Sequence, residues 1–327
     1  KMQLLKLMFS VAMVDECHYL SGRASNRTNA MFDLNDRTPL ISRCVYRWFI
    51  SGTPILNRPR DIYPVLAACA PEIIAPYNSY RAFTRYFCGG YWDGAKWIDT
   101  GATRTDELNK RLKKVMIRRL RKDHLDELPS QYDMIPIELK GNKMKAYVAQ
   151  ELTWQKDNAN YQKLEEDEHI ATVRRELGTL KAPTAIAYIK HLLTMEDKVV
   201  VFAYHKEVVR LIHEGLKAYN PALLRGGMTD KRKQTAVDEF TNNPDCRVFL
   251  ANHTSAREGL DLSVSKFILS VESSWIPGEI DQYTDRCSGF NQDKQVSIQF
   301  MVIENSLEEH MLRTVIDKKN KIIEILD

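Results

Sequence analysis

Residues 198–205 read KVVVFAYH, a run of apolar residues that ends in Tyr and His. A short apolar run without alternation is typical of a strand that is buried on both faces of a parallel sheet. A helical pattern follows at 206–219, and apolar runs and helical patterns then alternate towards the end of the chain. Strands that alternate with helices predict an α/β fold with a parallel sheet covered on both faces.

The pattern of apolar residues on either side of 198–205 predicts the remaining elements. The expected strands are 11–14, 46–50, 134–139, 198–203, 247–251, 267–271 and 297–303. The expected helices are 61–70, 105–122, 142–180, 183–195, 206–219, 231–241 and 307–325. We interpret 11–14 as a buried parallel strand, and 134–139 as an edge strand because Pro136 cannot donate to a ladder. We expect a first α/β domain at 1–140 with a helical insertion, a charged helical connector at 141–180 and a second α/β domain at 181–327.

Composition and cysteine spacing argue against a zinc-cluster protein and against a membrane-spanning one. The chain has 327 residues, 47 Lys and Arg against 43 Asp and Glu, and a net charge of +4. These are globular values, and the weak positive charge permits a nucleic-acid partner without requiring one. None of the six cysteines lies within four residues of another, which excludes the usual zinc clusters. No run of 18 apolar residues occurs, so we expect no membrane span.

Polar motifs follow the expected strands. Asp15-Glu16-Cys17-His18 comes directly after 11–14. Two adjacent acids at such a position can hold Mg²⁺ through water and polarise an attacking water, although an ordinary surface turn is the simpler interpretation of this motif alone. SGTPILN at 51–57 follows the strand at 46–50, and SAREGLDL at 255–262 follows that at 247–251.

Taken in order, these motifs resemble the Swi/Snf family of superfamily-two helicase-like DNA translocases, in its compact branch of annealing-helicase-like, phage and bacterial members. DECH at 15–18 is similar to the DEAH-like Walker B box, and SGTPILN to motif III. VVVFAYHKEV at 199–208 is similar to motif IV, SAREGLDL to motif V, and SWIPGEIDQYTDR at 274–286 to the approach to motif VI. LRGGMTDKRKQTAVDEF at 224–240 and VMIRRLRKDHLDELP at 115–129 also match family segments. The resemblance implies two RecA-like lobes, the first incomplete, with ATP and Mg²⁺ as cofactors.

The resemblance also implies roles for individual residues. Asp15 would bind Mg²⁺ through water, Glu16 would orient or deprotonate the attacking water, and Arg286 would complete the catalytic set. The expected nucleotide-binding residues are Asp15, Glu16, His18, Gly259, Asp261, Gln282 and Arg286. The residues expected to couple nucleotide state to DNA, besides His18, are Ser51, Gly52 and Thr53. The expected DNA-binding residues are His205, Arg225, Gly226, Gly227, Thr229, Thr254 and Ser255, and they would mostly contact phosphate.

The sequence departs from the family pattern at two points. None of its 14 glycines is followed by Lys, so it contains no Walker A loop. We expect the N-terminal P-loop half of lobe one to be missing, apolar sheet surface near 11–14 to be exposed in consequence, and the chain alone to be inactive as an ATPase. Gly289 stands where motif VI has a second arginine, which stabilises charge on the γ-phosphate. Arg257 or Lys294 are the candidate replacements.

The expected function is ATP-driven movement on double-stranded or forked DNA by a monomer. One alternative is a decayed motor, marked by Gly289, that only binds DNA or a protein, and another is an RNA-directed ATPase. The basic residues in 110–122 either contact phosphate or form a solvated helix face. The aromatic residues Tyr86, Phe87, Tyr91, Trp92 and Trp97 are expected to pack a helical insertion rather than to stack on bases. The compartment would be the cytoplasm for a bacterial or phage protein and the nucleus for a eukaryotic one.

Overall fold

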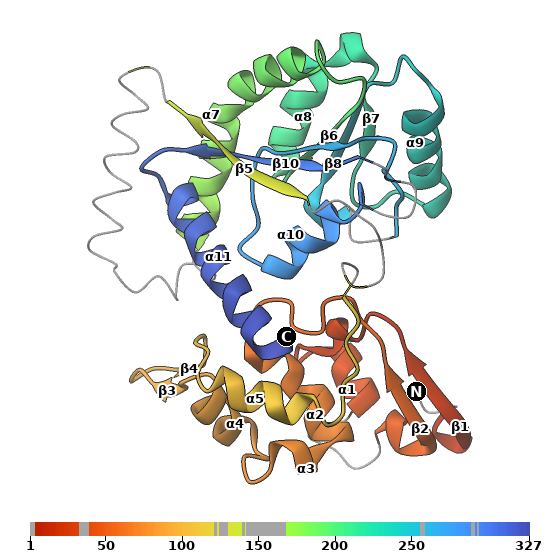
Figure 1. Cartoon of the computed structure of the whole chain (residues 1–327), viewed down its shortest axis with the longest axis vertical. Helices are drawn as coiled ribbons and strands as arrows, with labels where there is room; N and C mark the ends of the chain where they lie inside the picture. The colour runs from red at the N-terminus through yellow and green to blue at the C-terminus, as the bar shows by residue number, and fades with distance from the viewer. Residues whose placement is uncertain are drawn as a thin grey trace. The chain divides into compact units, whose positions relative to one another are not determined.

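The computed structural model describes residues 4–32, 39–120, 123, 130–138, 141, 168–255, 259–288, 292 and 294–327. The chain divides into two compact units, a first unit of 1–118 with 316–327 and a second unit of 119–315 (Figure 1). Helix α11 (Leu307–Leu326) starts in the second unit and ends in the first. The expected connector at 141–180 lies mostly outside the described residues, and the domain limits at 140 and 180 stay predictions.

A six-stranded parallel sheet forms the centre of the second unit, with the order β5-β10-β9-β6-β8-β7. Its strands are β5 (Gln131–Ile137), β6 (Val199–Ala203), β7 (Ala222–Leu224), β8 (Val248–Asn252), β9 (Phe267–Ser270) and β10 (Ser297–Ile303). The predicted α/β class with a parallel sheet is therefore confirmed. β5 is an edge strand, as Pro136 predicts, and it pairs with β10 of the second unit although it falls within the range 1–140.

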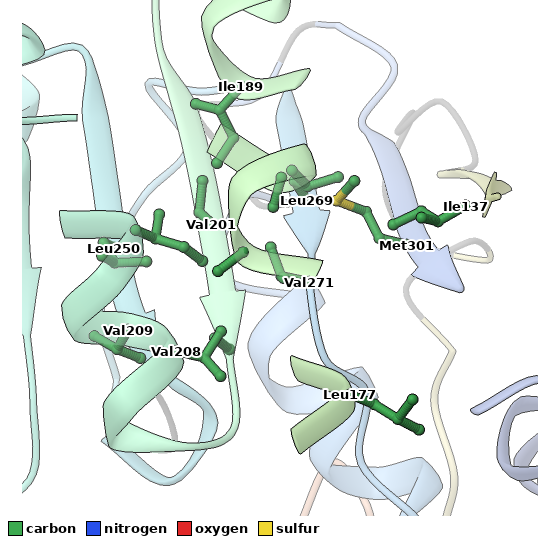
Figure 2. Close-up of a cluster of buried hydrophobic side chains, with 14 of the residues drawn as sticks. Ile137, Leu177, Ile189, Val201, Val208, Val209, Leu250, Leu269, Val271 and Met301 are labelled. Carbon is green, nitrogen blue, oxygen red and sulfur yellow. The ribbon is translucent and has the colours of Figure 1, made fainter. Parts of the chain in front are cut away.

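Both faces of this sheet are covered. The helices are α7 (Glu168–Leu192), α8 (Lys206–Gly215), α9 (Asp230–Asn242), α10 (Pro277–Thr284) and the first part of α11. Side chains alternate between faces along a strand. Val199 and Val201 accordingly pack with α7 and α8, as Figure 2 shows for Val201, while Val200 and Phe202 pack with α9 and α10. The apolar run at 198–203 is buried for this reason.

Several sequence expectations were wrong in detail. α7 is one helix that runs through Pro183, where we expected a break between 180 and 183. Proline costs a helical hydrogen bond, but the fully buried Leu177, Ala185 and Ile189 on either side keep the helix packed on the sheet. α5 (Thr105–Leu112) ends well before residue 122, where we expected the basic helix to end, and Lys113–Val115 form a turn.

The first unit contains a parallel pair, β1 (Phe9–Val14) and β2 (Cys44–Phe49). One face of this pair packs on a small core of Leu20, Phe32 and Ile41. The other face exposes apolar side chains: Val11 (43%), Met13 (62%), Tyr46 (62%) and Trp48 (56%). The interpretation of 11–14 as a strand is confirmed. Its burial is wrong for Val11 and Met13, and apolar sheet surface near 11–14 is exposed, as was also expected from the sequence.

The rest of the described part of the first unit consists of short helices and one hairpin. It contains α1 (Asn26–Phe32), α2 (Tyr63–Cys69), α3 (Pro71–Ile74), α4 (Tyr80–Phe87), α5 and the hairpin β3 (Tyr91–Trp92) and β4 (Trp97–Ile98). Short 3-10 helices are Leu4–Lys6, Cys17–Leu20, Leu40–Arg43 and Pro59–Ile62 here, and Lys217–Tyr219 and His253–Ser255 in the second unit. Phe87 is fully buried and packs with Ile325 and Leu326 of α11, as predicted for the aromatic residues. Tyr91 and Trp92 were also predicted to pack, but they are exposed on the hairpin.

Candidate functional site

The DECH and SGTP motifs lie side by side in the first unit. Val14 and Phe49 are register partners at the carboxyl ends of β1 and β2. The Ile50 amide donates to the Val14 carbonyl (2.9 Å), and the Cys17 amide donates to the Ile50 carbonyl (3.0 Å). The parallel pairing therefore brings together two motifs that lie more than thirty residues apart in the sequence.

His18 connects these two motifs through its side chain. Its Nδ1 lies 2.9 Å from Ser51 Oγ and 3.1 Å from Glu16 Oε2. Ser51 Oγ also accepts from the Thr53 amide (3.1 Å). The structure thus groups three of the predicted coupling residues, His18, Ser51 and Thr53, and places Gly52 between the last two.

Asp15 and Glu16 lie just beyond the end of β1. Glu16 has a left-handed backbone (φ 49°), and its amide donates to Asp15 Oδ1 (2.9 Å). The Glu16 side chain is 46% exposed, so its carboxylate reaches solvent. Burial and the neighbouring Glu16 carboxylate raise the pKa of the Cys17 thiol to about 11, which keeps that thiol protonated and unsuited to bind metal.

Asp15 and Glu16 are the candidate ligands for Mg²⁺ in the first unit. Among the described residues, no group of three or more His, Cys, Asp and Glu side chains could form a protein cage for a metal. Mg²⁺ does not need such a cage, because it keeps several waters and binds through one or two carboxylates together with substrate phosphates. The adjacent carboxylates of Asp15 and Glu16 fit that kind of site.

In the second unit, the predicted DNA-binding residues gather at one edge of the sheet. His205 follows β6, His253–Ser255 follow β8, and Arg225 to Thr229 follow β7. These strands are parallel, so their carboxyl ends share an edge. A Cβ added to Gly226 would lie 3.9 Å from Ser255 Oγ, which places the loop after β7 beside that after β8. Gly227 has φ +82°, a conformation that favours glycine. The side chain of Thr254 lies outside the described residues.

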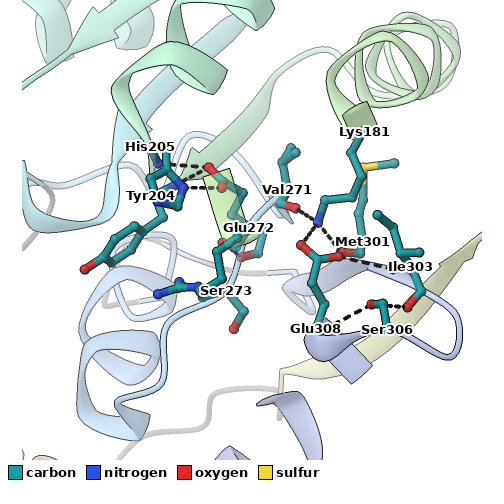
Figure 3. Close-up of polar contacts among 12 residues, drawn as sticks. Lys181, Tyr204, His205, Val271, Glu272, Ser273, Met301, Ile303, Ser306 and Glu308 are labelled. Atoms are coloured by element: carbon teal, nitrogen blue, oxygen red, sulfur yellow. Dashed lines mark hydrogen bonds and ion pairs between the residues drawn. The ribbon is translucent and has the colours of Figure 1, made fainter. Parts of the chain in front are cut away.

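Glu272 is a site residue that the sequence analysis missed. It follows β9 at the same edge and is 3% exposed. Its Oε2 accepts from the amides of Tyr204 and His205 (both 2.9 Å), and its Oε1 lies 2.6 Å from His205 Nδ1 (Figure 3). An acid directly after the apolar run 267–271 repeats the pattern of Asp15 after 11–14, and that repetition could have identified it.

The residues predicted to face the nucleotide from the second unit lie in two connected segments. The Leu262 amide donates to the Arg286 carbonyl (2.9 Å), which joins the segment of Asp261 to the end of α10, where Gln282 lies. Asp261 Oδ1 accepts from the Ser263 amide (3.0 Å), and both line a pocket of 440 Å³ beside α9. Gly259 is the first described residue after 256–258. Gly289 and Arg257 lie outside the described residues.

Several cations of the basic run have structural partners in the first unit. Arg118 pairs with Asp327, and Lys113 Nζ donates to the Asp327 carbonyl (2.8 Å). Arg111 pairs with Glu107 and donates to the carbonyl oxygen of Ile73 (2.7 Å). These contacts favour a structural role for the three residues. Arg121 and Lys122 lie outside the described part of the chain.

Comparisons with known proteins identify the family. Residues 1–190 match the SNF2-related domain, and residues 184–290 match the helicase conserved C-terminal domain. The DNA annealing helicase and endonuclease ZRANB3 of Mus musculus is 27% identical over 319 residues, which cover 93% of this chain and 28% of that protein. The SWI/SNF-related matrix-associated actin-dependent regulator of chromatin subfamily A-like protein 1 of Xenopus tropicalis is 26% identical over 96% of this chain and 33% of its own length. The chain thus spans about a third or less of these relatives.

Two solved structures are also similar. The Sulfolobus solfataricus SWI2/SNF2 ATPase core in complex with dsDNA has a TM-score of 0.44 and 17% identity, covering 100% of this chain and 75% of that chain. The C-terminal part of the Fun30 ATPase domain has a TM-score of 0.43 and 15% identity, covering 60% and 96%. Among the described helices, none is long and apolar enough to cross a membrane. Because the SNF2-related domain match covers more than half of its residues, the chain belongs to the SNF2-related domain family.

Proposed function

We propose that this chain is part of an ATP-driven translocase or remodeller of double-stranded DNA. The observation that carries the proposal is the placement of the polar motifs. In each unit the predicted site residues follow the carboxyl ends of parallel strands, where α/β proteins bind their ligands. The names of the relatives, a DNA annealing helicase and endonuclease and a regulator of chromatin, support the same proposal.

ATP and Mg²⁺ fit the first unit in this proposal. Asp15 would hold Mg²⁺ through water, and Glu16, whose carboxylate is half exposed, would orient or deprotonate the attacking water. The bound nucleotide supplies the phosphoanhydride bond. His18 touches both Glu16 and Ser51, so a change at the carboxylate would reach the SGTP loop through one imidazole ring.

DNA would be held by the second unit along the edge formed by His205, the loop 225–229 and Ser255. Glycines at 226 and 227 allow the backbone to approach a phosphate closely. Contacts of this kind position a duplex without reading its sequence, as a translocase requires.

The proposal is tested by measuring ATP hydrolysis in a protein in which this chain follows a phosphate-binding loop. The assay compares no nucleic acid, single-stranded DNA, duplex DNA, forked DNA and duplex RNA. We expect duplex or forked DNA to stimulate hydrolysis most. Glu16→Gln should lower turnover by about 100-fold or more, because it removes the general base, while duplex binding persists. Glu72→Gln, an exposed acid on α3, is the matched control and should leave turnover unchanged.

The same assay separates the alternatives. Gly289, in the place of an arginine that stabilises transition-state charge, favours a decayed motor as the second candidate function. Duplex binding without turnover, with turnover restored by Gly289→Arg, would establish that candidate in place of the motor. Stimulation by duplex RNA alone would replace both with an RNA-directed ATPase.

A further inference from the structure

One face of the hairpin formed by β3 and β4 carries two tryptophan side chains. Trp92 and Trp97 are register partners, and partners across a hairpin share a face. Trp97 is held in place, because its Nε1–H donates to Oγ1 of the buried Thr84 (3.0 Å). Its ring also packs on Gly90, where an added Cβ would lie 2.8 Å from Cζ2. Trp92 is 56% exposed, so its indole is open to solvent.

The turn of this hairpin is preformed. The Asp93 amide donates to the Lys96 carbonyl (3.1 Å), and Asp93 Oδ1 accepts from the Lys96 amide (2.8 Å). Gly94 within the turn has φ +100°, a conformation that favours glycine. A ligand that contacts Trp92 therefore orders little additional backbone, which lowers the entropic cost of binding.

Two arginines of α4 border the same face. Arg81 and Arg85 are exposed and one helical turn apart, and their Cζ atoms lie 5.9 Å and 5.5 Å from the centre of the Trp97 ring. Within the part of the chain that the structure describes, neither arginine pairs with a carboxylate. Residues 80–98 contain three basic residues and a single acid, Asp93. The face is therefore both aromatic and positively charged.

This combination fits an unpaired nucleic-acid strand. A base stacks on an exposed indole, and arginine guanidiniums bind the phosphates of the backbone. In a duplex the bases already stack on one another, so the indole has no base face to contact. The stacking requires no particular base, because every base has a π-face.

The hairpin is a separate part of the first unit. Figure 1 shows β3, β4 and α4 on the other side of this unit from β1 and β2, which carry the DECH and SGTP motifs. None of the residues that the proposed function uses lies in α4 or in the hairpin. The aromatic and basic face is thus available for a contact of its own.

We propose that the face formed by Arg81, Arg85, Trp92 and Trp97 is a binding site for an unpaired DNA strand. A base stacks on Trp92, and the two guanidiniums bind phosphates beside it. This inference rests on the proposed function, which takes DNA as the ligand. It adds a single-strand contact in the first unit to the duplex contacts proposed for the second.

The test is the affinity of this chain for fluorescent oligothymidylate, measured by anisotropy at several salt concentrations. Trp92→Ala should weaken binding about tenfold or more, the usual effect of removing one stacking side chain. Trp92→Phe should keep most of the affinity, because a phenyl ring still stacks. The double variant Arg81→Gln with Arg85→Gln should reduce the slope of log affinity against log salt by about 1.4, or about 0.7 for each cation lost.

Trp48→Ala is the matched control. Trp48 of β2 has the same side chain and the same exposed fraction as Trp92 (56%), but it lies outside the proposed face. Its removal should leave the affinity for oligothymidylate unchanged. The affinity of Trp92→Ala for a DNA duplex should also equal that of the wild type. Since Trp92 is exposed, its removal should not unfold the chain, and the arginine variant tests the site without altering the hairpin.

The outcomes distinguish this inference from the proposed function. Duplex binding without oligothymidylate binding, or an unchanged affinity for oligothymidylate in Trp92→Ala, overturns the inference and leaves the proposed function standing. An equal loss in Trp48→Ala also overturns it, because the effect would not belong to this face. Tighter binding of oligouridylate than of oligothymidylate overturns the assignment to DNA. Absence of binding to either strand or duplex overturns the proposed function, and the inference with it.

Discussion

The two strand pairs that carry the candidate site differ in how they are buried. Every residue of β6 and β8 is buried within the six-stranded sheet. β1 and β2 form a sheet of two strands with one apolar face exposed. Polar motifs follow both pairs, so the placement of site loops depends on parallel pairing and not on a completed sheet. In the first unit the loops are joined by His18 and Ser51, whereas in the second the buried carboxylate of Glu272, which follows β9, binds the loop after β6.

The largest expected effect comes from removing one aromatic ring from each pair. Phe249 of β8 is fully buried against Phe240, so Phe249→Ala should lower the stability of the second unit by about 3–5 kcal/mol. Tyr46 of β2 is 62% exposed, so Tyr46→Ala should lower the stability of the first unit by about 1 kcal/mol or less. Hydrogen exchange measured by mass spectrometry reports each unit separately.

Equal losses of stability in Phe249→Ala and Tyr46→Ala would contradict the expected difference in burial between the two strand pairs. They would mean that the face of Met13, Tyr46 and Trp48 is packed in solution against another chain or segment. A loss confined to Phe249→Ala would establish that β1 and β2 are held from one face only.

The elements that were predictable from the sequence were those in short segments rich in apolar residues. The strands at 198–203, 247–251, 267–271 and 297–303 all correspond to observed strands. β7 (Ala222–Leu224) was missed because three residues between Pro221 and Arg225 carry no recognisable period. α10 was missed because it begins with Pro277 and Gly278, which are otherwise turn signals. In both elements, packing on the sheet outweighs weak local preference.

The residues of the candidate site were predictable where a polar motif directly follows a strand. His18 and Ser51 were identified from their motifs, and the structure joins them. Glu272 was not identified, because its importance lies in the three donors that converge on it from 204 and 205. A single sequence does not show such a convergence, since it depends on the close approach of α7 at Gly178.

An intermediate effect is expected from breaking one ion pair in each unit. Lys181 is 1% exposed and binds Glu308 (2.6 Å) and the Met301 carbonyl (3.0 Å). Lys181→Met leaves the carboxylate buried without its cation and should cost about 3 kcal/mol. Arg118→Met breaks the partly exposed pair with Asp327 and should cost about 1 kcal/mol or less.

Urea denaturation followed by hydrogen exchange measures both losses. The double variant Lys181→Met with Glu308→Leu serves as control, and it should recover much of the stability because no buried charge is left. A loss at Arg118 as large as that at Lys181 would contradict the expected difference in burial between the two pairs.

The smallest expected effect is a pH dependence of folding stability that arises from His310 of α11. Burial, with a smaller contribution from Arg313, lowers the pKa of His310, which lies in the part of α11 that belongs to the second unit. The unfolded chain then binds a proton at a higher pH than the folded unit does. Stability is therefore fully present above the unfolded pKa near 6.5 and declines as the pH falls through that value towards the folded pKa.

The expected loss is about 0.5 kcal/mol or less, because the site is only partly buried. Hydrogen exchange at about pH 7.5 and about pH 5.5 should show this loss in β8, and His310→Gln should remove that part of the dependence. An equal pH dependence in the variant would assign the loss to another group.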